Sequence, residues 1–439
     1  MNPPVIGYAG MTHLGLCSGI AAASKGFSVV GYHGDRELVA AIEAGDLPVV
    51  EPELDGMFAA NRERLTFSDK PEGLSGCDVV YVAVDVPTDD DGKSDLSPIE
   101  AMIETVTPHL NDNAVLVILC QVPPGFTRGK CLSDEQLFYQ VETLIFGRAV
   151  ERATQPERFI IGCADPQKPL PQSYGTFLGA FGCPLLPMGY ESAELAKIAI
   201  NCFLVASVST TNTLAGLCER LGADWSEIAP SLRLDARIGP KAYLNPGLGI
   251  SGGNLERDLA TVCRLGEARD SDTRVIESFR GLSAYAKDWI WRVLEGGVLS
   301  KVESPRIAVL GLAYKENTHS TKNSPALVLL DHLRKYEVCV FDPVVPASAA
   351  PETTGAESAL AACDGADVTV IATPWPEFGE LEPKALAATM NGTTLIDPYA
   401  MLDGAAVTAA GLTHHTLGRP AQAAAGRTPV RPGQNAAAG

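Results

Sequence analysis

Positive charge is scarce in this 439-residue chain. Against 53 aspartate and glutamate residues it carries 34 lysine and arginine residues, for a formal net charge of -19. A surface this acidic repels phosphate backbones and anionic lipid, which argues against nucleic acid or a membrane as a bulk partner. A local basic cluster can still hold one phosphate group, so we expect a small-molecule partner.

Paired cysteines and targeting segments are also missing. The eleven cysteines include no CxxC pair and no cluster with the seven histidines, which argues against a structural metal site or a disulfide framework. The N-terminus, MNPPVIGYAG, lacks the charged start and apolar run of a signal peptide. No apolar stretch reads as long enough to span a bilayer. The sequence predicts reduced thiols, no metal and a cytoplasmic location.

Three regions follow one another along the chain. In the first, short β-branched runs at 5–9, 28–32, 79–84 and 114–120 alternate with helical patterns, which predicts a parallel sheet flanked by helices. The second has no convincing strand and begins with a long apolar helix that ends at Gly222. The third repeats the strand–helix alternation from RIAVLGLAYK at 306 onward.

This order predicts an α/β protein with two Rossmann-like, doubly wound domains joined by a long helical segment. We place the boundaries as follows: a dinucleotide-binding domain at 1–187, a central helical domain at 188–297, a C-terminal substrate domain at 298–418, and a disordered Ala/Gly/Pro-rich tail at 419–439.

A degenerate phosphate-binding turn follows the first strand. GMTHLG, residues 10–15, has the spacing of GxGxxG, with Thr12 in place of the middle glycine. That glycine normally lets the backbone approach a pyrophosphate. Thr12 therefore either shifts the cofactor or offers its hydroxyl to a phosphate.

A glycine-dense loop, KAYLNPGLGISGGNLERD at 241–258, resembles the active-site loop GxGFGGxCFxKD of the UDP-glucose/GDP-mannose dehydrogenase family. Gly247, Gly249, Gly252 and Asp258 match, but Asn254 stands at the cysteine and Arg257 at the lysine. The segments GDLPVVEPEL, VDVPTDDDGKSDLS and QVPPGFT, and the helix pattern ELxKxxxN with Lys197 and Asn201, extend the resemblance to about residue 418.

The resemblance implies a catalytic group in which Lys197, Asn201 and Asp258 hold the substrate hydroxyl, a water and the developing oxyanion. For Lys197 the alternative is a snorkelling surface lysine. Asn254 cannot form a covalent adduct with a carbonyl. The family motif NPEFLRE falls on 140–146, which places Phe146 where we expect the catalytic acid.

The resemblance also implies the binding residues. We assign the cofactor, NAD with NADP left open, to the two turns after the first strands, to later strand ends and to one C-terminal cation: Gly10, Thr12, His13, Leu14, Gly15, His33, Asp35, Arg36, Val86, Pro87, Gln121 and Lys322. We assign the substrate to Phe146, Arg237, Tyr243, Gly249, Gly252 and Lys315. For Arg237 a surface ion pair is the alternative. Tyr399 replaces an arginine that the family carries.

These features predict an NAD-dependent oxidoreductase that oxidises a hydroxyl of a phosphorylated or nucleotide-linked sugar to a carbonyl and stops before the acid. One alternative is a redox-neutral sugar epimerase that takes a hydride and returns it. Another is a catalytically silent paralogue that binds a sugar nucleotide. The resemblance further implies a homodimer that pairs through the helix at 191–222.

Overall fold

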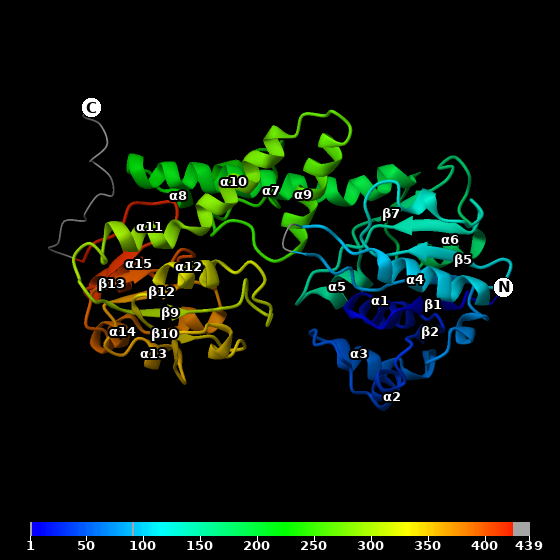
Figure 1. Ribbon diagram of the computed structural model, residues 1–439, viewed down its shortest axis with the longest axis horizontal. Helices are drawn as coiled ribbons and strands as arrows, with labels where there is room; N and C mark the ends of the chain where they lie inside the picture. The colour runs from blue at the N-terminus through cyan, green and yellow to red at the C-terminus, as the bar shows by residue number, and fades with distance from the viewer. Residues whose placement is uncertain (1, 90–91, 425–439) are drawn as a thin grey trace. The chain divides into compact units, whose positions relative to one another are not determined.

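The computed structural model describes residues 2–89 and 92–424 (Figure 1). The chain divides after Ile200 into two compact units, residues 1–200 and residues 201–439. The division falls inside one long helix, so that helix contributes residues to both units.

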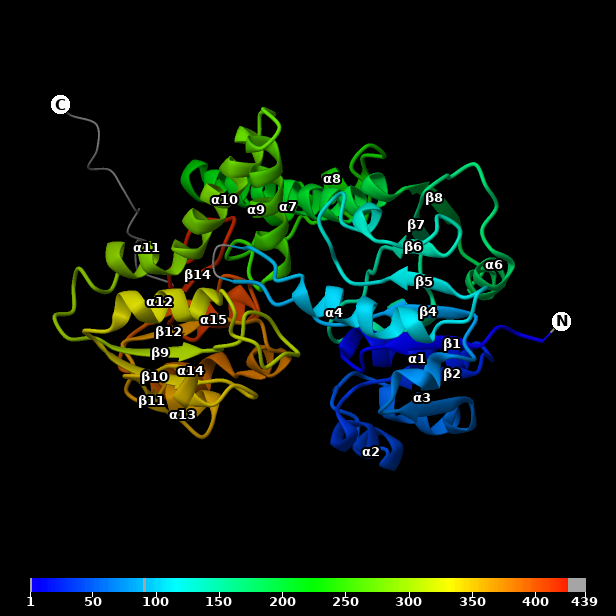
Figure 2. The same cartoon turned by 45° about the vertical axis from the view of Figure 1, so that its right-hand side comes forward.

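The first unit is built on an eight-stranded sheet with the order β3-β2-β1-β4-β5-β6-β7-β8. Every neighbouring pair is parallel except β6 and β7. Several of these strands lie side by side in Figure 2. The strands are β1 Ile6–Ala9, β2 Val29–Tyr32, β3 Leu65–Ser68, β4 Val79–Val82, β5 Val115–Ile118, β6 Leu137–Gln140, β7 Phe159–Cys163 and β8 Leu185–Gly189.

Strand order reverses at β1, which pairs with β2 on one side and β4 on the other. In parallel sheets of this kind, ligands bind beyond the carboxyl ends of the strands at such a reversal. Buried apolar side chains cover both faces of the sheet. The helices are α1 His13–Ser24, α2 Arg36–Ala44, α3 Leu54–Ala60, α4 Ser97–Val106, α5 Ala149–Thr154 and α6 Gln172–Gly179.

Between β8 and β9 the chain is helical. The helix α7 spans Tyr190–Leu221 and ends at Gly222, whose φ of 82° supplies the left-handed turn that stops a helix. It is followed by α8 Trp225–Leu234, α9 Asn254–Glu267, α10 Arg274–Lys287 and α11 Trp289–Gly296. By length and composition α7 could cross a membrane, with a mean hydropathy of 1.4. The expectation that no apolar stretch is long enough was therefore wrong, although a core helix of a soluble protein passes the same test.

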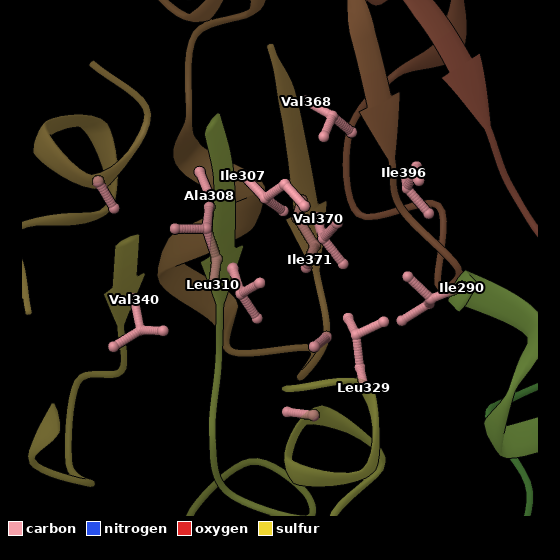
Figure 3. Close-up of a cluster of buried hydrophobic side chains, with 14 of the residues drawn as sticks. Ile290, Ile307, Ala308, Leu310, Leu329, Val340, Val368, Val370, Ile371 and Ile396 are labelled. Atoms are coloured by element: carbon pink, nitrogen blue, oxygen red, sulfur yellow. The ribbon is translucent and has the colours of Figure 1, made fainter. Parts of the chain in front are cut away.

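The second unit contains a six-stranded, fully parallel sheet with the order β11-β10-β9-β12-β13-β14. Its strands are β9 Arg306–Leu310, β10 Glu337–Phe341, β11 Thr354–Gly355, β12 Val368–Ile371, β13 Thr394–Ile396 and β14 Thr413–His415. The helices are α12 Pro325–Leu333, α13 Ala359–Ala362, α14 Pro383–Thr389 and α15 Gly404–Ala409. Figure 3 shows its core, in which Ile307, Val370 and Leu329 are buried together with Ile290 of α11.

The predicted α/β class with two Rossmann-like sheets is confirmed. The four strands expected in the first region and those expected near 306, 338, 368 and 397 are present. The predicted tail begins too early, however. Backbone hydrogen bonds join Gln422 and His414 in both directions, at 2.8 and 2.9 Å, so residues 419–424 pack beside β14. The remainder of that tail, 425–439, lies outside the described residues, and the domain boundaries stay predictions.

Candidate active site

The turn between β1 and α1 is held tightly by its first and last glycines. Gly10 has a φ of 108°, a conformation that favours glycine, and a Cβ there would lie 2.6 Å from the carbonyl oxygen of Ala83. A Cβ on Gly15 would lie 1.9 Å from the Gly10 carbonyl oxygen. Because neither position has room for a side chain, β1 and α1 approach closely, as a dinucleotide-binding turn requires. Leu14, the second residue of α1, packs against the core below.

Thr12 directs its hydroxyl toward the protein. Its Oγ1 donates a hydrogen bond to the Ala83 carbonyl oxygen at 2.9 Å. The hydroxyl hydrogen is therefore used within the protein, and the role of Thr12 toward a pyrophosphate stays a prediction.

The residues after β2 divide their roles. His33 follows directly on β2, at the strand end where a ribose-binding acid normally stands. Asp35 is the N-cap of α2, and its Oδ1 accepts hydrogen bonds from the Glu37 and Leu38 amides at 2.9 and 3.2 Å. Asp35 therefore already has a structural role, and the neighbouring Arg36 is exposed.

Further predicted cofactor residues lie at the same edge of the sheet. Val86 and Pro87 follow β4 and Gln121 follows β5, and both strands run parallel to β1. The loop after Gln121 is tied to α7 by Glu194, whose buried carboxylate accepts from the Gly125 and Thr127 amides at 2.6 and 2.9 Å. Glu194 lies three positions before Lys197, so this loop and Lys197 are fixed by one helix.

The sequence interpretation missed a carboxyl group beside Lys197. Burial raises the pKa of Glu142 to about 7, and the charge of Lys197 opposes that shift. Arg152 also lowers this pKa, and the Glu142 carboxylate accepts a hydrogen bond from the Leu144 amide. Glu142 thus sits at the edge where β6 ends, half-buried and charge-coupled to a lysine. The first glutamate of the matched NPEFLRE segment falls on it, which was the signal that could have identified it.

The expectation that Phe146 removes the acid from this part of the site was therefore incomplete, because Glu142 supplies one four residues earlier. The Phe146 side chain is 49% exposed. Its ring lies against the His13 imidazole, with ring centroids 4.2 Å apart. Phe146 thus contacts the cofactor turn.

A second group of catalytic candidates lies in the second unit. Asn201 on α7 donates a hydrogen bond from Nδ2 to Oδ2 of Asp258 on α9, and both residues are buried. Arg257 is buried as well and pairs with the other carboxylate oxygen of Asp258, at 3.3 Å. Asn254 is the first residue of α9 and is exposed, one turn before Asp258. Lys197 precedes Asn201 by one turn on α7.

Within the second unit, the glycine loop packs on α10 and on the segment that follows β9. Gly249 has a φ of 76°, and a Cβ there would meet the Ser283 carbonyl oxygen at 2.6 Å. Gly252 has a φ of 79° and lies against the Tyr314 ring, and its amide donates to the Lys322 carbonyl oxygen at 3.0 Å. Both glycines are thus required by the backbone path.

The side chains predicted to bind the substrate phosphates lie in several different environments. Arg237 has 89% of its side chain exposed and pairs with Asp235 at 2.7 Å, the surface ion pair that was the alternative for it. Tyr243 is half-exposed. The Lys315 ammonium lies 5.8 Å from the Tyr314 ring centroid, beside the glycine loop. The Tyr399 hydroxyl lies 3.4 Å from the Ala372 carbonyl oxygen.

Comparison with known proteins identifies the chain. Residues 5–173, 191–283 and 308–404 match the NAD binding, central and UDP binding domains of the UDP-glucose/GDP-mannose dehydrogenase family. A UDP-glucose 6-dehydrogenase, TuaD, of Bacillus subtilis strain 168 is 30% identical over 436 residues, covering 95% of this chain and 93% of that protein. The chain belongs to the UDP-glucose/GDP-mannose dehydrogenase family.

Other relatives agree with this membership. The UDP-glucose 6-dehydrogenase of Pseudomonas aeruginosa PAO1 is 30% identical over 439 residues, covering 94% of this chain and 96% of that protein. Among solved structures, a UDP-glucose dehydrogenase from Pyrobaculum islandicum is 26% identical, with a TM-score of 0.79, and covers 90% of this chain and 94% of that one. A UDP-D-ManNAc dehydrogenase from Pyrococcus horikoshii is 25% identical, with a TM-score of 0.80, covering 94% and 99%.

As a member of this family the protein is an NAD-dependent oxidoreductase of nucleotide sugars. The turn at Gly10–Gly15 fits the cofactor, because its two glycines lie where side chains are excluded and it lies at the strand-order reversal. Among residues 2–89 and 92–424, no group of three or more His, Cys, Asp or Glu side chains could hold a metal ion. All eleven cysteines are free thiols.

Proposed function

We propose that this dehydrogenase oxidises a hydroxyl of a nucleotide-linked sugar to a carbonyl and releases that carbonyl compound without making the acid. The observation that carries the proposal is Asn254 at the start of α9, one turn before Asp258. An amide nitrogen is a poor nucleophile and cannot hold an aldehyde as a covalent adduct. The second hydride transfer, which needs a hydrated or covalently held aldehyde, therefore has no thiol at position 254 to support it.

The first oxidation keeps its supporting residues. NAD, when bound, accepts the hydride. We assign to Lys197 the electrostatic stabilisation of the developing alkoxide, since a preorganised cation in a partly dry site stabilises such charge strongly. We assign to Asn201 and Asp258, joined by their hydrogen bond, the orientation of the substrate hydroxyl. Arg257 holds the other oxygen of Asp258 and so fixes that carboxylate.

Glu142 is the proton acceptor that we add to this scheme. Its pKa of about 7 is close to working pH, where a general base combines availability with strength. The nearby Lys197 charge favours its ionised form. Glu142 could also remove a proton from a hydrated aldehyde, so it is the residue through which a thiol-free second oxidation would run.

A product analysis tests the proposal. The protein is incubated with NAD and either UDP-glucose or UDP-N-acetylmannosamine, and NADH and products are quantified by absorbance and mass spectrometry. We expect one NADH per sugar and a product that a hydrazine reagent captures as a carbonyl. Two NADH per sugar together with a uronic acid would contradict the single oxidation. Product with an inverted carbon and no net NADH would instead favour epimerisation.

A gain-of-function variant sharpens the test. Asn254→Cys places a thiol at the position where the family loop carries its cysteine, and Asn254→Ser places a similar small side chain without thiol reactivity. We expect the cysteine variant to yield acid and a second NADH, and the serine variant to behave like the unaltered protein. Failure of the cysteine variant to form acid would mean that the missing thiol is not what stops the reaction.

We further propose that two copies associate through α7. Its exposed apolar side chains Phe203, Leu214, Leu217 and Leu221 recur at helical spacing along one side, and Phe203 is 80% exposed and Leu221 72% exposed. Light scattering of the purified protein should give the mass of a dimer. Leu217→Glu should shift it toward the monomer, whereas Leu282→Glu, on α10, should not.

A further inference from the structure

Glu51 is a buried carboxylate whose contacts join two functional segments of the first unit. Only 1% of its side chain is exposed, although the preceding Val50 is almost fully exposed. Oε1 lies 2.8 Å from Nε2 of His13 and accepts from the Gly147 amide at 2.9 Å. Oε2 accepts from the Ala149 amide at 3.2 Å. Burying a carboxylate costs desolvation free energy, which its three partners from two distant segments offset. We therefore ask which segments Glu51 holds in place.

The first segment that Glu51 holds is the loop 142–149. Gly147 turns with a φ of 83°, and Ala149 is the first residue of α5, whose own N-cap residue makes no side-chain cap. Glu51 supplies that acceptor from a different part of the chain. The loop carries Glu142 at one end and Phe146 in the middle. Its conformation therefore determines where the proton acceptor and the aromatic ring of the site lie.

The second segment is the cofactor turn, through His13. This residue begins α1, directly after Thr12. Its imidazole contacts the Glu51 carboxylate and the Phe146 ring, whose centroid lies 4.2 Å from that of the imidazole. Because a carboxylate oxygen can only accept hydrogen bonds, the His13 nitrogen that faces Glu51 acts as the donor. Asp85 is a second acid near the imidazole, since the His13 charge lowers the pKa of Asp85 against the larger effect of burial.

We propose that Glu51 is a positioning residue which, through His13, couples NAD binding at the turn to the conformation of the loop 142–149. A dinucleotide on the turn restrains α1 at its first residue. His13 passes that restraint to Glu51 and Phe146, and both hold the loop. The proposal rests on the cofactor turn assigned above and is independent of whether oxidation stops at the carbonyl.

Hydrogen exchange measures this coupling without a sugar substrate. Exchange is followed by mass spectrometry in peptides covering 142–154, with and without saturating NAD, and calorimetry verifies NAD binding for each variant. In the unaltered protein we expect NAD to slow exchange there by about tenfold, a ratio that one charge-assisted hydrogen bond supports. His13→Leu, compared at an NAD concentration that calorimetry shows to saturate that variant, should lose most of that slowing.

Matched variants distinguish loss of the coupling between NAD and the loop 142–149 from a general loss of stability of that loop. His13→Gln retains an N–H donor toward Glu51 and should restore most of the effect, whereas Glu51→Ala should abolish it. Glu151→Gln, which removes an exposed acid of α5 that pairs with Arg148, should leave the slowing intact. The proposal would be overturned if NAD slowed exchange in His13→Leu by the same factor as in the unaltered protein, even if exchange in the variant were faster overall. Absence of NAD binding to the unaltered protein would overturn the cofactor turn as well.

Discussion

The two Rossmann-like sheets share the strand order around their first strands, but the turns after those strands, after β1 and after β9, differ in what their backbone amides bind. In the first unit, α1 starts at His13, three residues after Gly10, and among the described residues no acidic side chain accepts from the Thr12 or His13 amides. In the second unit, β9 ends before Gly311, whose φ of 99° repeats the sharp turn, but α12 starts only at Pro325.

The second turn is closed by the protein itself. Asp342, just after β10, accepts from the Leu312 and Ala313 amides at 2.7 and 3.0 Å and from the Trp375 indole at 3.1 Å. Burial raises the pKa of Asp342, but its backbone hydrogen bonds outweigh that effect and lower it overall. The amides that would meet a phosphate in the first unit therefore meet a carboxylate in the second. Strand order creates the position of a nucleotide site, and side chains decide whether it is available.

The largest expected effect distinguishes a lysine that acts in the reaction, Lys197, from one that binds the substrate, Lys315. Lys197→Met should lower turnover by ~10²-fold or more, the scale of losing one preorganised charge, with little change in KM. Lys315→Met in the C-terminal domain should mainly raise KM. The readout is steady-state NADH formation with whichever of UDP-glucose and UDP-N-acetylmannosamine supports it. Lys168→Met, an exposed surface change, is the control. Unchanged turnover in the first variant would return Lys197 to the role of a snorkelling lysine.

Glu142→Gln should lower turnover by ~10²-fold, the lower end of what a general base contributes. In the unaltered protein the rate should rise as pH passes upward through about 7, because the base works when ionised. The variant should lose that step. The folded-state pKa lies above the ordinary value of 4.5, so the folded protein binds this proton more tightly and its stability should fall as pH rises from 4.5 to about 7. A persisting pH step in the variant would exclude Glu142 as its source.

Gly15→Ala should weaken NAD binding by about tenfold or more, since its Cβ would lie 1.9 Å from a backbone oxygen and the turn must open. Binding is measured by calorimetry. Gly179→Ala, at the end of α6 with open space around its Cβ, should bind NAD normally. If both variants bind alike, the turn does not need its close approach to α1.

Asp342→Asn should destabilise the second unit by about 1–3 kcal/mol, the cost of leaving buried donors unpaired, and should leave NAD affinity unchanged. Because the folded pKa of Asp342 is lowered, its stabilising contribution is present above the ordinary aspartate value of about 3.9 and disappears as pH falls through the lower folded pKa. Urea unfolding at several pH values checks both. Asp364→Asn, an exposed change in the same unit, should be neutral.

The smallest expected effect concerns cofactor choice. His33 cannot reproduce the paired hydrogen bonds of a carboxylate to the ribose diol, and Asp35 already caps α2. Discrimination between NAD and NADP should therefore be less than about tenfold by calorimetry. A hundredfold preference for NAD would show that Asp35 leaves its capping position or that another group binds the ribose.

Much of this protein could be predicted from its sequence. Alternation of β-branched runs with helical patterns identified both sheets, since burial on two faces leaves continuous apolar runs. Strands such as β3, β6 and β8 were missed because their short sequences carry no run of β-branched residues. Glycines at 10, 15, 249 and 252 marked turns correctly, because backbone geometry admits few other residues there. Ungapped spacing around Asp258 predicts that the family cysteine is replaced by Asn254, and this assignment stays a prediction.

Contacts between distant segments required the tertiary structure. The motif spacing points to Phe146, whereas the raised pKa of Glu142 beside Lys197 depends on burial, because desolvation is set by what surrounds a group in space. The roles of Glu51 and Asp342 are likewise invisible in sequence, since each carboxylate holds amides far away along the chain. Sequence patterns located β1 and β9 and the turns that follow them, and three-dimensional packing decided which of these two turns remains open to a phosphate.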